Sequence, residues 1–249
     1  MKFPIFGCLA LPALLLAACD RAEPEVQPHD TVGQETRDQQ PELPPLANAE
    51  AFELAFGRGA AATRTVGNRE LTYRPARIVD LGNRKALISL GEMEDGCHGC
   101  SGSIGVHYLA SDGGPWEVDG EWLDAGGGSS WGAPATDWSV SRDFLSVPVI
   151  FTTGGGTWQG YTCSQAELIA LLPSGPAQVA VFPIGYSDGG TIDGDTTIDG
   201  EIGAVELGRN FTVNYAGERD GAAVQFRETY RWSGRRYDLA TAPDDMESC

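Results

Sequence analysis

The clearest hydrophobic pattern lies near the C-terminus, where apolar and polar residues alternate. Phe211, Val213 and Tyr215 alternate with polar residues, which is the two-residue period of a half-buried strand. The same period recurs over 224–232, with Val224, Phe226, Tyr230 and Trp232 on one face and Gln225, Arg227, Thr229 and Arg231 on the other. Ser233-Gly234 then offers a turn before residues 237–239 return. The pattern predicts an antiparallel meander with one face in water.

Shorter apolar runs indicate further strands upstream. They cover residues 86–90, 104–108, 147–151 and 179–184. Pro148 and Pro183 interrupt the last two runs, and proline favours strand edges or bulges. Residues 47–56 can form one short helix. The sequence therefore predicts a mostly β fold, a single antiparallel β-sandwich or barrel-like domain with at most one or two short helices.

One segment fits two interpretations. Ser164 to Glu167 forms an S-x-x-E capping box ahead of the apolar run 168–172, which is typical of a short helix. A strand hairpin that turns at Ser174-Gly175-Pro176 fits the same residues equally well.

Composition and charge agree with this picture and exclude one class of partner. The 249 residues include 33 glycines and 15 prolines, which suit strands and turns better than a helical bundle. Lysine and arginine number 17 against 35 acidic residues, for a formal charge of −18. Nucleic-acid binders carry a basic patch or stripe, so this charge argues against a nucleic-acid partner.

The N-terminus has the form of an export signal. Met1-Lys2 precedes an uncharged run over 3–18, and the run ends in Leu16-Ala17-Ala18-Cys19. This ending resembles the lipobox of bacterial lipoproteins. The resemblance implies cleavage before Cys19, lipid attachment to Cys19, and a lipid-anchored, periplasm-facing place in the bacterial cell envelope. Asp20 leaves the choice between inner and outer membrane open. An ordinary signal peptide, with Cys19 a plain thiol, is the alternative.

A second kind of sequence follows the export signal. Residues 19–46 contain five prolines, an acidic excess and few large apolar residues, so they cannot bury enough surface to fold. The predicted organisation is a signal peptide over 1–18, a disordered acidic tether over 19–46, and a single β-rich globular domain over 47–249.

The cysteines supply the sharpest candidate chemistry. Cys97-His98-Gly99-Cys100 is not a c-type haem site, because Ser101 stands where that site needs histidine. A thioredoxin-like centre needs a helix after the motif and structural zinc needs a second ligand pair, and the sequence indicates neither. A structural disulfide and a redox-active pair remain. Cys163 and Cys249 are candidates for a second disulfide. The four cysteines that remain after Cys8 in the signal peptide and Cys19 at the lipid site are set aside allow three pairings.

An acid-rich repeat suggests a second possible site. Thr191–Thr196 is followed by the similar Thr197–Ile202, which makes Asp193, Asp195, Asp199 and Glu201 weak calcium candidates. Their spacing does not match an EF-hand, and each Asp-Gly pair is a strong turn signal. Tight turns are the favoured interpretation, and the sequence predicts no metal or other cofactor.

No motif identifies an enzyme. The sequence lacks G-x-S-x-G, H-E-x-x-H and a Walker loop, and no catalytic residue is predicted. Five of the six tryptophans lie between positions 116 and 158, where they could form a sugar- or peptide-binding face. The first hypothesis is a non-enzymatic envelope domain that binds a protein or glycan and is held to the membrane by its lipid. A thiol-disulfide active protein using Cys97 and Cys100 is the alternative, and a calcium-dependent binding module is the third.

Overall fold

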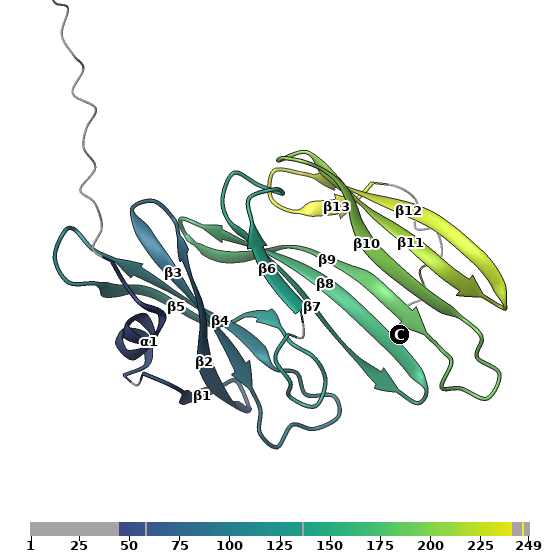
Figure 1. Cartoon of the computed structure of the whole chain (residues 1–249), viewed down its shortest axis with the longest axis horizontal. Coiled ribbons are helices and arrows are strands. Elements are labelled where there is room, and N and C mark those ends of the chain that lie inside the picture. The colour runs from purple at the N-terminus through teal and green to yellow at the C-terminus, as the bar shows by residue number, and fades with distance from the viewer. Residues whose placement is uncertain (1–44, 58, 136, 241–245, 247–249) are drawn as a thin grey trace, which may run out of the picture. The chain divides into compact units, whose positions relative to one another are not determined.

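The chain folds into two antiparallel β-sheets and one helix. The computed structural model describes residues 45–57, 59–135, 137–240 and 246. Within these residues there are thirteen strands and a single α-helix (Figure 1). All of them belong to one compact unit, Pro41–Cys249. The prediction of a mostly β, sandwich-like or barrel-like domain with at most one or two short helices is confirmed.

Each sheet is a meander, because strands that follow each other along the chain are also neighbours in the sheet. Sheet A consists of β1 (Ala62–Val66), β2 (Arg69–Asp80), β3 (Arg84–Glu92), β4 (Ser103–Ala110) and β5 (Glu117–Gly127). Sheet B consists of β6 (Asp137–Ser141), β7 (Val149–Trp158), β8 (Tyr161–Leu172), β9 (Gly175–Ser187), β10 (Thr197–Glu206), β11 (Asn210–Arg219), β12 (Ala222–Trp232) and β13 (Tyr237–Leu239).

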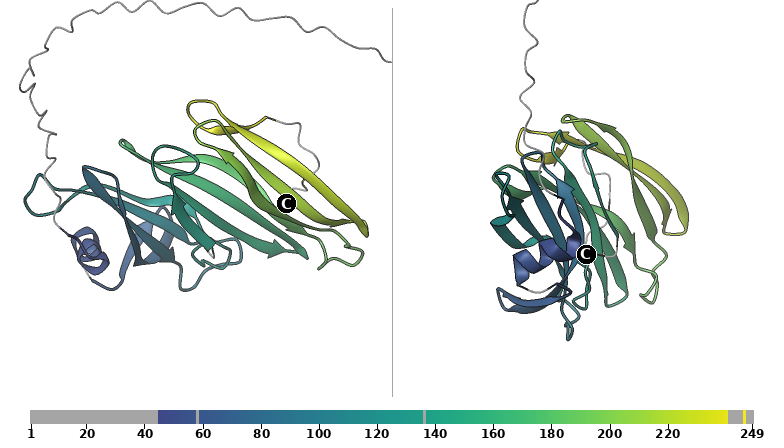
Figure 2. Two further views of the ribbon diagram at one scale, coloured as in Figure 1. Left: turned by 45° about the horizontal axis from the view of Figure 1, so that its top comes forward. Right: turned by 60° about the vertical axis from the view of Figure 1, so that its left-hand side comes forward.

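The predicted N-terminal helix is present as α1 (Asn48–Phe56) and packs against sheet A (Figure 2). Phe52 and Phe56 are buried, and their rings stack with centroids 4.3 Å apart. The helix ends at Gly57, whose φ of 72° is a left-handed conformation that glycine adopts without strain. Leu46, which the sequence analysis assigned to the tether, is partly buried against the same core.

The ambiguous segment after Ser164 is a strand, and the hairpin interpretation is the correct one. Ala166, Leu168 and Ala170 of β8 pack into the core inside sheet B. Ile169 and Leu171 point the other way, into a core shared with sheet A. A strand buried on both faces has a continuous apolar run instead of an alternating one, which is why the sequence pattern could not separate it from a helix.

Strand β4 is buried on both faces for a related reason. Residues 103–109 are all buried, whereas a strand with one wet face would leave every second residue exposed. Ile104 and Val106 pack against sheet B, while Leu109 packs into the α1 core. Since α1 and sheet B cover opposite faces of sheet A, no face of β4 is left for water.

The expectation that proline marks a strand edge or a bulge holds for Pro183 and not for Pro148, which lies outside the strand. Pro148 lies just before β7, where its carbonyl accepts a hydrogen bond from the Leu171 amide at 2.9 Å. Pro183 lies in β9 beside a register shift in its pairing with β8. A bulge lets the ladder pass a residue that has no amide hydrogen to donate.

The C-terminal meander follows the predicted alternation, with one residue that the pattern did not explain. Phe211, Val213 and Tyr215 are buried and pair with β12 in antiparallel register. Glu228 lies on the apolar face of β12 and is only 2% exposed. Its carboxylate accepts hydrogen bonds from the hydroxyls of Tyr215 at 3.1 Å and Tyr230 at 2.6 Å. These two donors satisfy a polar group that would otherwise be costly to bury.

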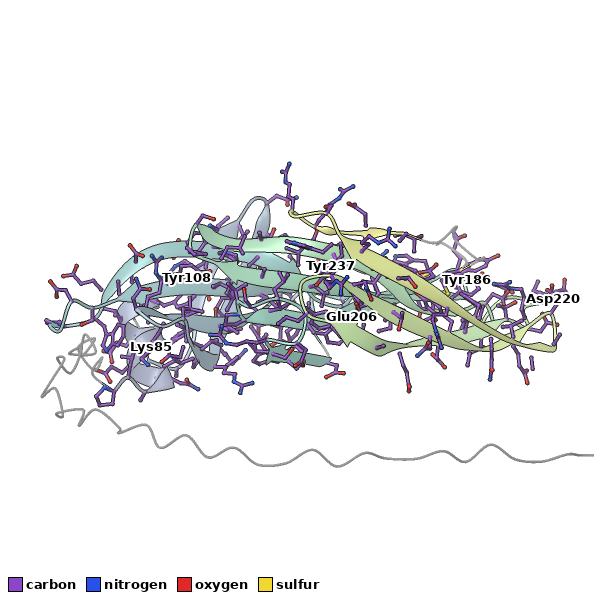
Figure 3. The ribbon with its side chains drawn as sticks, turned by 90° about the horizontal axis from the view of Figure 1, so that it is seen from above. Lys85, Tyr108, Tyr186, Glu206, Asp220 and Tyr237 are labelled. Atoms are coloured by element: carbon purple, nitrogen blue, oxygen red, sulfur yellow. A yellow bond between two sulfur atoms is a disulfide. The ribbon has the colours of Figure 1, made fainter. Side chains whose placement is uncertain are left out.

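Three other buried tyrosines donate their hydroxyls to backbone carbonyls. Tyr73 donates to Leu123 at 2.5 Å, Tyr108 to Leu172 at 2.8 Å, and Tyr237 to Phe144 at 2.6 Å. Burial raises the pKa of each of the three phenols to about 12. Tyr108 and Tyr237 are labelled in Figure 3 and belong to different cores, so the effect is not confined to one part of the fold.

Candidate functional site

The Cys97–Cys100 pair forms a disulfide in the loop between β3 and β4. The Cys100 amide also bonds the Cys97 carbonyl at 2.9 Å, which closes a tight turn around His98 and Gly99. The chain continues at Ser103 into strand β4, so no helix follows the motif. The pair therefore lacks the helix N-terminus that lowers the pKa of a thiol in thioredoxin-like centres.

A second loop, 128–134, holds the disulfide loop in place. The Gly132 amide bonds the Cys100 carbonyl at 2.9 Å, and the Gly102 amide bonds the Ala133 carbonyl at 3.0 Å. The two backbones come so close that a Cβ at Gly96 would lie 2.2 Å from the Trp131 carbonyl oxygen. Glycine is therefore needed here for the approach of the two loops.

Three rings gather where these loops meet the end of β7. His98 stacks on Trp131 with centroids 4.8 Å apart and on Trp158 with centroids 5.8 Å apart, both at 17° between planes. The ring nitrogen Nε2 of His98 bonds the Thr157 carbonyl. Trp131 and Trp158 remain 62% and 39% exposed. The disulfide turn thus fixes an exposed aromatic cluster, which we call the His98 stack.

A pocket of about 290 Å³ lies beside the stack. This disulfide pocket is lined by Gly99, Cys100, Ser101, Gly127, Gly128, Ser130, Thr152, Gly154, Gly155, Trp158, Cys163, Gln165 and Glu167. Its walls therefore come from the disulfide loop, the end of β5, the 128–134 loop, and strands β7 and β8.

The glycine runs 126–128 and 154–156 help to form the pocket by packing against each other. A Cβ at Gly154 would lie 2.3 Å from the Gly128 carbonyl oxygen, so neither backbone could hold its place with a larger residue. The Ser130 amide adds a bond to the Gly155 carbonyl at 2.8 Å. Close packing between distant segments, rather than a phosphate cradle, accounts for these runs.

Glu167 connects the disulfide pocket to a second hollow along the seam between the sheets. This seam groove, of about 500 Å³, is lined by Arg69, Ser101, Trp122, Asp124, Ala125, Gly126, Gly127, Glu167, Pro176 and Gln178. The Glu167 carboxylate accepts hydrogen bonds from the Gln178 amide nitrogen at 3.0 Å and the Gly127 amide at 3.4 Å. Both hollows are lined by Ser101, Gly127 and Glu167, so they lie next to each other.

Thr152 adds an unsatisfied polar group to the pocket wall. The residue is 1% exposed, and its Oγ1 has no hydrogen-bond partner among the described residues. Buried hydroxyls are nearly always hydrogen-bonded, so an exception at a pocket wall is unusual.

The calcium candidates are not brought together. Asp193 and Asp195 lie in the loop between β9 and β10, while Asp199 and Glu201 lie on β10 and are exposed. No group of three or more His, Cys, Asp or Glu side chains placed to hold a metal ion occurs among the residues that the structure describes. The calcium hypothesis gains no support from this arrangement.

The turn prediction for the second Asp-Gly pair is wrong. Asp199-Gly200 lies within β10, where Gly200 pairs with Tyr215 of β11. The Tyr215 ring packs over Gly200 so closely that a Cβ there would lie 2.7 Å from it. The glycine serves cross-strand packing here instead of a turn.

Of the remaining candidate cysteines, Cys163 is the one that lies within the described residues. Cys163 of β8 is disulfide-bonded, and its partner lies outside the described residues. Cys249 and the lipidation candidate Cys19 also lie outside them, so both predictions stay open. Within the described residues, no helix is long and apolar enough to cross a membrane.

Sequence reasoning found part of this site. It singled out the disulfide and the tryptophans, of which only Trp131 and Trp158 are substantially exposed. It missed Thr152, which carries no motif, and it considered Glu167 only as part of a helix capping box, because both residues lie on strands far along the chain from the disulfide. Comparison with protein-family models, with curated proteins and with solved structures finds no match to this chain.

Proposed function

We propose that this protein is a lipid-anchored lipoprotein of the bacterial cell envelope whose β-domain binds an envelope component in the disulfide pocket. The lipobox resemblance at Leu16–Cys19 supports the anchor. The observation that carries the binding role is the pocket beside the His98 stack, where exposed aromatic rings, glycine backbone and a few polar groups meet. Small-molecule sites in proteins commonly combine these features.

The composition of the pocket favours binding over catalysis. Within the part of the chain that the structure describes, Glu167 is the only ionisable side chain that lines the pocket apart from the disulfide-bonded cysteines. General acid–base chemistry usually pairs two such groups, and nucleophilic catalysis needs a free nucleophile beside a base. The pocket offers neither combination.

The anchor is tested by mass and fractionation. Intact-mass measurement of detergent-extracted protein should show the loss of residues 1–18 and added acyl mass, because two or more acyl chains hold a protein stably in a bilayer. The Cys19→Ala variant should leave the membrane fraction or accumulate unprocessed. A soluble wild-type protein of unmodified mass would contradict the anchor.

The binding role is tested by co-sedimentation of the detergent-extracted full chain with detergent-washed insoluble envelope material. The wild type should sediment with this material, and Trp158→Ala should reduce the sedimented fraction several-fold by removing one pocket wall. Leu207→Ala is the matched control, because Leu207 is an exposed apolar residue outside the pocket. Equal sedimentation of both variants would show that the pocket is not the binding site.

One observation favours a second candidate function. Cys97 is exposed and Cys100 lines the pocket, so a partner thiol could reach the disulfide. A thiol-disulfide active protein would show a redox midpoint above about −230 mV, in the range of exchange-active proteins.

We expect the bond to be structural instead. It should then resist glutathione-range reductants, and replacing both cysteines with serine should cost about 2 kcal/mol or less, since the closed loop is short. A redox titration followed by thermal unfolding of the double variant separates the two functions.

A further inference from the structure

Resting on the proposed function, the geometry points to a ligand class: we propose that the disulfide pocket holds a ring of a neutral saccharide. The inference rests on the charge of the lining residues, the mixture of their hydrogen-bonding groups, the exposed indole and the adjoining seam groove.

The charge of the pocket disfavours an anionic ligand. Among the described residues that line it there is no lysine, arginine or histidine, and Glu167 supplies a negative group. A phosphate or carboxylate would therefore meet a carboxylate with no cation to offset it. The formal charge of −18 on the whole chain adds to this repulsion.

The polar groups also fit hydroxyls better than they fit a cation. The Glu167 carboxylate is already hydrogen-bonded by Gln178 and Gly127, so it is not a free counter-ion. Ser101, Ser130 and Gln165 present hydroxyl and amide groups, which both donate and accept hydrogen bonds. A sugar hydroxyl likewise does both, whereas an ammonium group only donates. A quaternary ammonium ion would need an aromatic cage, and Trp158 is the only aromatic side chain that the described residues contribute to the pocket.

Trp158 supplies the apolar surface that a sugar ring needs. One face of a pyranose ring carries mainly C–H bonds, and their positive edges pack well on the electron-rich face of an indole. The stacking of Trp158 on His98, which is held in the disulfide turn, fixes the indole in advance. A rigid aromatic platform loses little conformational entropy when a ligand binds.

Two further features agree with a bound sugar ring, and the second agrees with a ring that is part of an oligosaccharide. The buried Thr152 hydroxyl at the wall has no partner among the described residues, as expected if a bound group or its water satisfies it. The seam groove lies beside the pocket and shares Glu167 with it, and Trp122, Asp124 and Gln178 are on its walls, so a second hollow is close by for an adjoining sugar unit.

The test is isothermal titration of the detergent-solubilised full chain with two neutral oligosaccharides, chitotetraose and maltotetraose. At least one should bind saturably. Trp158→Ala should weaken that binding about tenfold, Trp158→Phe should restore part of it, and Leu207→Ala should leave it unchanged. Glu167→Gln gives a second, independent variant if Trp158→Ala proves unstable, and it should weaken binding several-fold.

The outcomes separate this inference from the proposed function. Envelope co-sedimentation that depends on Trp158 without saccharide binding would overturn the saccharide and leave the binding role intact. Loss of both would overturn both. Binding of a neutral peptide such as acetyl-trialanine amide in place of the sugars would assign the pocket to a peptide. Saccharide binding that folded Trp158 and Glu167 variants retain in full would place the site elsewhere.

Discussion

Raising the pH from about 9 to 12 should unfold this protein cooperatively. Tyr73, Tyr108 and Tyr237 are each less than 5% exposed, and burial raises the pKa of each to about 12. Tyr215 and Tyr230 have raised pKa values as well, chiefly through burial and then through the nearby Glu228 carboxylate. All five hydroxyls donate hydrogen bonds, which a phenolate cannot do.

The direction of the effect follows from proton binding. In the unfolded chain the tyrosines ionise near pH 10, so above that pH the folded protein holds protons that the unfolded chain has lost. The free energy of unfolding therefore falls as the pH rises. A shift from 10 to about 12 removes about 2 kcal/mol per tyrosine at pH 12. Three such groups together remove about 6 kcal/mol, which is comparable to the whole stability of many domains.

Circular dichroism and tyrosinate absorbance measured on the same samples check this prediction. The β signal and the absorbance of the buried tyrosines should change in one transition, because a buried phenol ionises only when the chain unfolds. Tyr108→Phe should lose less stability between neutral pH and pH 12 than the wild type does, because it has one fewer buried phenol to ionise. Tyr161→Phe, which removes an exposed tyrosine, should not move it. Full tyrosine ionisation with the β signal intact would contradict the argument.

Replacing Cys163 should cause the second large loss of stability. Cys97 and Cys100 are paired with each other, and Cys163 is disulfide-bonded to a cysteine outside the described residues. Only Cys8, Cys19 and Cys249 remain in the sequence. If residues 1–18 are removed and Cys19 carries lipid, Cys249 is the partner. A bond between them closes a loop of about 86 residues, for which the chain-entropy estimate is about 4–5 kcal/mol.

Non-reducing peptide mapping and denaturant unfolding of Cys163→Ser check this pairing. We expect a Cys163–Cys249 peptide and a loss of stability at least twice that of the Cys97→Ser, Cys100→Ser double variant, since the latter bond closes only a short loop. A map that joins Cys163 to Cys19 would contradict both the pairing and the lipid anchor. The two predictions therefore test each other.

Elements with a local pattern could be predicted from the amino-acid sequence. Alternation over 211–215 and 224–232 predicted β11 and β12, because a strand with one wet face shows its two-residue period directly. The short helix predicted over 47–56 and the bulge beside Pro183 followed from equally local rules. The Cys-x-x-Cys spacing indicated a possible disulfide that the structure contains.

Features that depend on what covers each face of a strand became clear from the packing of the folded chain. The run after Ser164 is a strand because two cores bury its two sides, and Asp199-Gly200 stays in a strand because Tyr215 packs over the glycine. The pocket joins segments near positions 100, 128, 155 and 167, which meet through backbone contacts between glycines. Hydrophobic periodicity indicates which residues of one segment are buried. It does not indicate which distant segments pack together, so the pocket could be found only in the folded chain.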